Sequence, residues 1–179
     1  MMRARMRYPC PLIALVLPLL LGSAGDPGVL IEVDLDRFML LSRDLAADEI
    51  GPALRIAVGS PAHPTPTGEF HPREVVRNPG WFPGAHARRL GARARPPSSD
   101  GPLGAGKIPL EFGAIQIHGG ADPLELGKPV SLGCVTLHDR AWLVLVDWLR
   151  ARASLAPEQA TPRGDLVSAF RRPIRVVVR

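Results

Sequence analysis

Apolar and polar positions alternate near the start of the chain, where residues 29–34 read VLIEVD. Alternation with a period of two places one face of a strand against a core and the other in water. A second apolar run, FMLL at residues 38–41, follows a short polar turn, so the pattern predicts an opening β-hairpin. Residues 54–58 (LRIAV) predict a third strand, which the Gly-Ser-Pro sequence at 59–61 ends.

Proline and glycine interrupt the middle of the chain. Residues 62–70 read AHPTPTGEF, and no helix is expected there because Pro64 and Pro66 lack an amide donor and restrict the residue before them. Residues 75–107 are dominated by Pro, Gly and Arg. This composition is typical of irregular structure, and we expect an extended flap or lid.

Apolar periodicity returns in the second half of the chain. Residues 108–117 (IPLEFGAIQI) predict a strand that ends at His118, and residues 174–178 (IRVVV) predict a closing strand. Asp139 is a good N-cap for a helix that runs to about Ala153. Such a helix would bury an apolar stripe made of Trp142, Leu143, Leu145, Val146 and Leu149. The chain is therefore predicted to be a mainly β domain with one principal helix, which follows Cys134.

Residues 1–24 have the layout of a secretory signal peptide. Three arginines without an acidic residue precede an apolar run at residues 11–21, and small residues follow it. The run is about eleven residues long, short of the ~18–20 needed to span a bilayer. We therefore expect cleavage near Ala24, an exported domain formed by residues 25–179, and membrane attachment only if the segment is retained.

The charge of the whole chain overstates that of the exported domain. The 179 residues carry 22 basic and 17 acidic side chains, a formal charge of +5, but removal of residues 1–24 leaves +2. Arginines at positions 88, 89, 93 and 95 cluster in the expected flap without interleaved aromatic residues. Such a cluster is more typical of a solvated loop than of a nucleic-acid surface, so no nucleic-acid partner is expected.

One stretch holds the residue types needed for nucleophilic catalysis. His118 and Cys134 flank a segment rich in Gly, Pro and Asp, which favours a loop that folds the thiol back onto the imidazole. A thiol with a pKa of about 8.5 is only a few per cent thiolate at pH 7, so we expect His118 to activate it, as an imidazolium ion-pair partner or as a base. Loss of Cys10 with the signal segment leaves Cys134 without an intramolecular disulfide partner, which favours a reactive role.

Two other interpretations of these residues stay open at this stage. His118, Cys134 and His138 are three potential metal ligands. Structural zinc sites usually add a fourth ligand and closer Cys/His pairs, so we expect no metal. A cysteine in a small exported protein is also often a packed apolar residue.

Four segments of the sequence carry a resemblance to a known family. They read HPTPTGEF (residues 63–70), GPLG (101–104), FGAIQIHGG (112–120) and SLGCVTL (131–137). In this order, and with fifteen residues between His118 and Cys134, they resemble the YkuD-type L,D-transpeptidase catalytic domain, a family that remodels bacterial peptidoglycan. The resemblance implies a mainly β domain built as a curved β-sandwich, with no cofactor.

The same resemblance implies roles for individual residues. Cys134 matches the family's nucleophile, His118 its catalytic imidazole, and the carbonyl of Gly119 the group that orients the imidazole. The implied reaction is acyl transfer from a peptidoglycan stem peptide, in which the thiolate attacks the bond between meso-diaminopimelate and D-alanine and an amine then attacks the thioester. The implied partners are stem peptides, and the implied location is the periplasm or cell envelope.

Other matching residues fall in supporting positions. The amides around Leu132 and Gly133 match an oxyanion hole, and Ser131 matches a residue that braces the loop. Gly120 and Thr136 match positions that contact substrate.

The chain departs from the family pattern at two positions. Leu132 stands where His or Lys is common, and Thr136 stands where Arg or Asn is usual. The second departure predicts slow turnover on a tetrapeptide donor, unless Lys107 or Arg140 supplies the missing charge. An L,D-carboxypeptidase, a related wall amidase of the same fold, or a wall-binding module without turnover are the alternatives.

Overall fold

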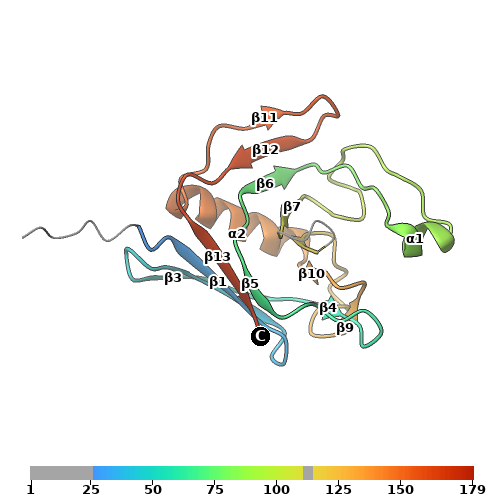
Figure 1. The fold of residues 1–179 in the computed structure, drawn as a ribbon, viewed down its shortest axis with the longest axis horizontal. Coiled ribbons are helices and arrows are strands. Elements are labelled where there is room, and N and C mark those ends of the chain that lie inside the picture. Colours follow the sequence, from blue (N-terminus) through green and yellow to red (C-terminus); the bar gives the residue numbers. More distant parts are fainter. Residues whose placement is uncertain (1–25, 111–114) are drawn as a thin grey trace, which may run out of the picture.

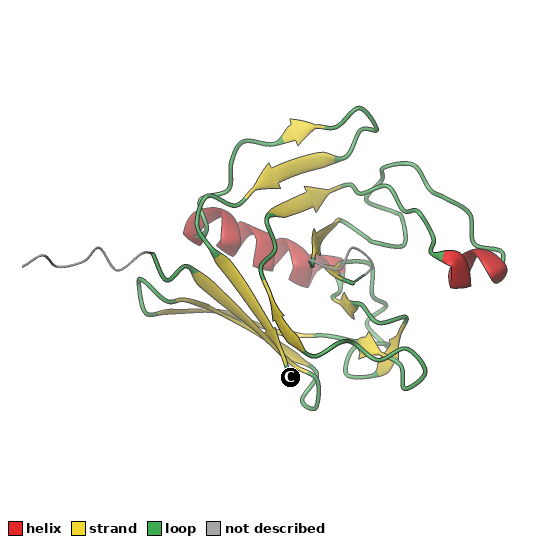
Figure 2. Cartoon of the chain, in the orientation of Figure 1, coloured by secondary structure: helices red, strands yellow, loops and turns green. Residues whose placement is uncertain are grey.

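The computed structural model describes residues 26–110 and 115–179, so the expected signal segment, residues 1–24, lies outside the described residues. The fold is mainly β, and a hydrophobic core lies between two sheets and one long helix (Figures 1 and 2). The curved β-sandwich expected from the sequence is confirmed. Among the described residues, no helix has the length and apolar character needed to cross a membrane.

The first sheet has five strands in the order β3-β2-β1-β13-β5. They span Glu49–Arg55, Met39–Asp44, Val29–Asp34, Ile174–Val178 and Gly68–Phe70, respectively. The predicted opening hairpin is present as the antiparallel pair β1 and β2, and β13 pairs with β1 in parallel. Buried and half-buried positions alternate along β1, as its sequence predicts, because one face of the strand packs on the core.

The second sheet has six strands in the order β10-β8-β7-β6-β12-β11. They span Val135–Thr136, Gln116–His118, Gly106–Pro109, Glu74–Arg77, Leu166–Ala169 and Gln159–Ala160, respectively. The parallel pair β8 and β10 brings the strand that carries His118 beside the strand that follows Cys134. A short parallel pair, β4 (Val58–Gly59) and β9 (Pro129–Ser131), completes the β structure.

Two strand predictions need correction in their bounds. The single strand expected at residues 54–58 is two strands, because β3 ends at Arg55 and β4 begins at Val58. The run at residues 108–117 is also not one strand, since β7 and β8 form an antiparallel pair in which Lys107 lies opposite His118. Apolar alternation alone does not show where a chain reverses direction.

The principal helix, α2 (Asp139–Arg152), packs against strands of both sheets. The Trp142 ring is fully buried and lies so close to Gly106 of β7 that a Cβ there would be 2.1 Å from it. On the other side, the Trp148 ring lies against Gly51 of β3 in the same way. The predicted apolar stripe is confirmed except at Leu143, which is 43% exposed.

The N-cap of α2 is not the expected residue. His138 is the N-cap, and its imidazole accepts the N–H of Arg140, whereas Asp139 is the first residue of the helix. The expectation of an Asp139 cap was therefore wrong by one position.

The flap between β6 and β7 spans residues 78–105 and includes a short helix, α1 (Ala85–Arg89), that the sequence did not predict. It projects to one side of the molecule, at the right of Figure 1. Trp81 and Arg95 pair through both of their backbone N–H groups, at 3.0 and 2.9 Å, which closes the flap into a loop.

Candidate active site

Pairing of three neighbouring strands sets up a row of side chains. Lys107 of β7 lies opposite His118 of β8, and His118 lies opposite Thr136 of β10. Directly opposed residues of a sheet point to the same face, so these three side chains stand side by side. Gln116 lies two positions before His118 on β8, and Cys134 lies two positions before Thr136, just ahead of β10. Both side chains therefore point to the same face of the sheet.

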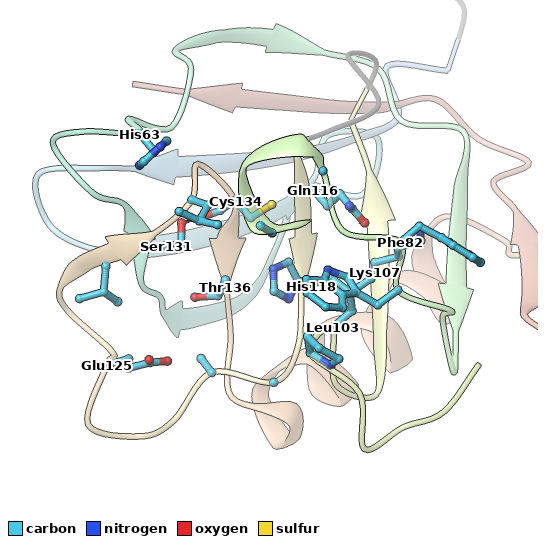
Figure 3. Close-up of a pocket in the computed structure, with 18 of the residues that line it drawn as sticks. His63, Phe82, Leu103, Lys107, Gln116, His118, Glu125, Ser131, Cys134 and Thr136 are labelled. Atoms are coloured by element: carbon cyan, nitrogen blue, oxygen red, sulfur yellow. Dashed lines mark hydrogen bonds between the residues drawn. The ribbon is translucent and has the colours of Figure 1, made fainter. Parts of the chain in front are cut away.

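All five of these residues line one cleft of about 740 Å³ (Figure 3). The flap contributes Trp81 and Phe82 to its wall, together with Leu103. His63 is half-buried and lines the opposite side of the cleft, from the loop that the sequence segment HPTPTGEF forms. The two residues expected to carry the chemistry, His118 and Cys134, are thus brought into one cleft.

The imidazole of His118 is held by its own backbone neighbour. Nδ1 lies 2.6 Å from the carbonyl oxygen of Gly119, and since a carbonyl can only accept, Nδ1 carries the proton. Nε2 is then the atom left with a lone pair. The residue is only 8% exposed, and this burial lowers the pKa of His118 to about 4, with a smaller contribution from the Lys107 ammonium. His118 is therefore neutral at pH 7.

Cys134 carries a thiol and forms no disulfide in the part of the chain described. Burial raises the pKa of this thiol above its usual range, although the backbone N–H of Gln116 and the charge of Lys107 act in the opposite direction. The site therefore rests as a neutral thiol beside a neutral imidazole. Of the two roles expected for His118, these pKa directions favour a proton acceptor over an imidazolium that stabilises a resting thiolate.

The loop before Cys134 is braced by Ser131. Its hydroxyl donates to the carbonyl of Cys134 at 2.6 Å and accepts the N–H of Gly133 at 3.2 Å. Gly133 has a φ of +109°, a conformation that side chains rarely adopt, which explains the glycine before the cysteine. The Gly133 N–H is thus already engaged and would have to leave Ser131 to serve an oxyanion. Leu132 is 55% exposed at the edge of the cleft.

Asp139 holds the turn that follows His118. Its Oδ1 accepts the N–H of Ala105, at 2.8 Å, and the N–H of Gly120, at 2.9 Å, so that one carboxylate ties this turn to the base of the flap. The packing leaves no room for side chains at Gly104 and Gly119, where a Cβ would lie 2.1 and 2.2 Å from that oxygen. This role of Asp139 was not predicted from the sequence. The glycines of the GPLG and IHGG segments, Gly104 and Gly119, could have indicated it, because both lie against this carboxylate.

The two expected substrate positions differ in what they can offer. Gly120 lines the cleft, but its N–H is already donated to Asp139. Thr136 also lines the cleft and is only 8% exposed, with its hydroxyl 3.5 Å from the carbonyl of Ala57. Neither arrangement supplies the side-chain N–H donors that the usual Arg or Asn would bring to the position of Thr136.

Of the two basic residues considered as substitutes for that charge, only one lies in the cleft. Lys107 lines it, whereas Arg140 is exposed and is not among the described lining residues. Two further residues of the lining, Gln116 and Glu125, were not expected from the sequence. The side-chain oxygen of Gln116 is buried and has no hydrogen-bond partner among the residues that the structure describes.

The metal hypothesis receives no support from the geometry. Within residues 26–110 and 115–179, no three His, Cys, Asp or Glu side chains come close enough to hold a metal ion. His138 instead caps α2.

Comparison with known proteins gives a consistent picture. A family model described as the L,D-transpeptidase catalytic domain, YkuD, matches residues 28–169. The Bacillus subtilis (strain 168) protein YkuD, whose name places it among the L,D-transpeptidases, is 35% identical over 85 residues, which are 48% of this chain and 40% of that protein. The YkuD protein of Bacillus licheniformis is 34% identical over 104 residues, 57% of this chain and 51% of that protein. The matches therefore span about half of these relatives or less.

Solved structures support the fold. The catalytic domain of an L,D-transpeptidase from E. faecium superposes with a TM-score of 0.54 at 16% identity, covering 84% of this chain and 96% of that one. At this level of identity the likeness concerns the arrangement of the backbone.

Proposed function

The chain belongs to the L,D-transpeptidase catalytic domain family, and from this membership we propose that it is a peptidoglycan-remodelling L,D-transpeptidase. Cys134 is the nucleophile, His118 the base, and the Gly119 carbonyl the group that fixes the base. The observation that carries the proposal is the 2.6 Å contact between His118 Nδ1 and the Gly119 carbonyl. It directs Nε2 to act as proton acceptor in the cleft that Cys134 also lines.

The first half of the reaction forms a thioester. As the Cys134 thiol attacks the carbonyl between meso-diaminopimelate and the terminal D-alanine, its proton passes to Nε2 of His118. The imidazolium so formed is an acid and returns the proton to the leaving amine of D-alanine. The C–N bond breaks, D-alanine departs, and the acyl group stays on the sulfur.

The second half consumes the thioester. An amine attacks the thioester carbonyl, His118 takes the proton that the amine loses, and the thiol leaves with a proton from the imidazolium. An amine from a second stem peptide gives a crosslink, a D-amino acid gives exchange, and water gives the L,D-carboxypeptidase alternative.

The resting neutral pair has a functional consequence. A thiol that ionises only as the substrate arrives is protected from unwanted acylation and oxidation, because the thiolate is the reactive species. Ser131 and Asp139 act on either side of this pair as positioning residues, the first through the loop of Cys134 and the second through the turn of His118. Family membership also supports action at the cell wall after export.

Product analysis tests the proposal. The purified protein is incubated with disaccharide-tetrapeptides, with and without a D-amino acid, and the products are identified by mass spectrometry. We expect release of D-alanine with crosslinked or exchanged products, and no product from Cys134→Ala. Hydrolysis alone would identify a carboxypeptidase, and binding without any product from the wild type would identify a wall-binding module.

A further inference from the structure

The cleft carries one positive and one negative side chain in a bipolar arrangement. Among its described lining residues, Lys107 is the only lysine or arginine and Glu125 the only carboxylate. Figure 3 shows them on opposite sides of the His118 imidazole. A substrate bound at Cys134 therefore meets a positive charge in one direction and a negative charge in the other.

The side chain of Lys107 lines the cleft and forms none of the ion pairs between described residues. Strand pairing sets it beside His118, and it is half-buried. Within residues 26–110 and 115–179, no carboxylate lies within ion-pair distance of its ammonium. A partly desolvated cation without a counter-charge is unfavourable, and an anion bound in the cleft would relieve this cost.

Glu125 is held at the rim by its own loop. Its backbone N–H donates to the carbonyl of Asp122, and its Oε2 accepts the N–H of Asp122 at 3.2 Å. These two contacts keep the carboxylate beside the cleft, where its other oxygen can accept from a ligand.

We infer that the cleft selects a zwitterionic amino-acid end, whose carboxylate binds Lys107 and whose ammonium binds Glu125. The inference rests on the proposed function and assigns this end to the side chain of the donor residue, since meso-diaminopimelate carries both groups there. A free D-amino acid acceptor has the same chemistry. An amine held as ammonium by Glu125 could not attack the thioester, however, which favours the donor over the acceptor.

Donor discrimination tests the inference. Three tetrapeptide donors are compared that carry, at the third position, meso-diaminopimelate, its side-chain amide, or L-lysine, which lacks the carboxylate. We expect Lys107→Met to lower kcat/KM on the first donor about ten- to a hundredfold, the range of a lost charge-assisted contact, mainly through KM. On the other two donors the change should stay within about threefold, and Lys107→Arg should restore most of the loss. The exposed Lys128, outside the described lining, supplies the matched control Lys128→Met, which should leave all three donors unchanged.

Glu125→Gln tests the proposed contact between Glu125 and the side-chain ammonium of the donor. It should weaken donors with a free side-chain amine and spare a donor whose side-chain amine is acetylated. Equal losses on all donors for Lys107→Met would overturn the inference, because that result means that Lys107 acts only through the pKa values of His118 and Cys134. A loss seen only as a higher requirement for acceptor would also overturn the assignment to the donor.

Binding without turnover separates this inference from the proposed function. Dissociation constants are measured for the three donors with Cys134→Ala, alone and combined with Lys107→Met. Discrimination that depends on Lys107, in a wild type that makes no product, would support the inference and reject the proposed function. Turnover by the wild type, with the same dissociation constants in both variants, would do the reverse.

Discussion

Replacement of Asp139 by alanine should loosen the turn that carries His118. The carboxylate accepts two backbone N–H groups, and a hydrogen bond to a charged group contributes about 1.5–3 kcal/mol. Gly120 is exposed, so water can replace one of these bonds, whereas Ala105 is half-buried. We therefore count one bond in full and expect Asp139→Ala to lower the free energy of unfolding by about 1.5–3 kcal/mol.

Urea unfolding measures this loss, with tryptophan fluorescence as the signal, because Trp142 is buried against β7 beside the affected turn. Asp139→Asn is the matched control: its Oδ1 can still accept both N–H groups, so the loss should stay below about 1 kcal/mol. The acylation rate should also fall in Asp139→Ala and largely persist in Asp139→Asn. Equal losses of stability in the two variants would refute the role of Oδ1 as acceptor and leave only the charge of the side chain.

Three other predictions follow from the structure. Burial raises the pKa of Cys134 and lowers that of His118 to about 4, so the rate of alkylation by iodoacetamide should rise continuously from about pH 6 to 9. A plateau of this rate at neutral pH would instead indicate a thiolate–imidazolium pair. Arg172 holds the pKa of the buried Asp44 well below 3.8, so this pair stabilises the fold above about pH 4 and loses its effect as the pH falls further. Arg172→Met should cost about 3–5 kcal/mol at pH 7 and flatten that acid dependence in urea titrations, and an unchanged midpoint would contradict it. Gly104 has a φ of +59°, and a Cβ there would lie 2.2 Å from the backbone nitrogen of Gly120, in the turn after His118. Gly104→Ala should therefore lower both the melting temperature and the acylation rate. Wild-type values for both would show that the turn can move aside without loss of stability or activity.

Elements with a strong local pattern could be predicted from the sequence. The closing strand has its predicted bounds, because alternate apolar residues of residues 174–178 bury one face. The helix after Cys134 ends within one residue of the prediction. The start of β3 could not be predicted: Pro52 argues against a strand, and only its place at the sheet edge makes the proline acceptable.

The candidate site shows the same division between local and long-range information. His118 and Cys134 could be named from residue type and spacing. The row that adds Lys107 depends on the register of β7 against β8, and the sequence does not specify that register locally. The protonation state of His118 could not be predicted from the sequence either. Burial lowers its pKa, and the extent of burial is known only from the folded chain.

The most direct test of the account is the mass of the acyl-enzyme. The protein is mixed with a tetrapeptide donor, quenched in acid within the first turnover, and examined by intact and peptide mass spectrometry. If Cys134 is the nucleophile and His118 its base, the protein should gain a mass equal to the donor minus D-alanine. The gain should be located on Cys134, absent in Cys134→Ala and slow to appear in His118→Gln. D-alanine release that persists in Cys134→Ala, or an adduct on another residue, would contradict it.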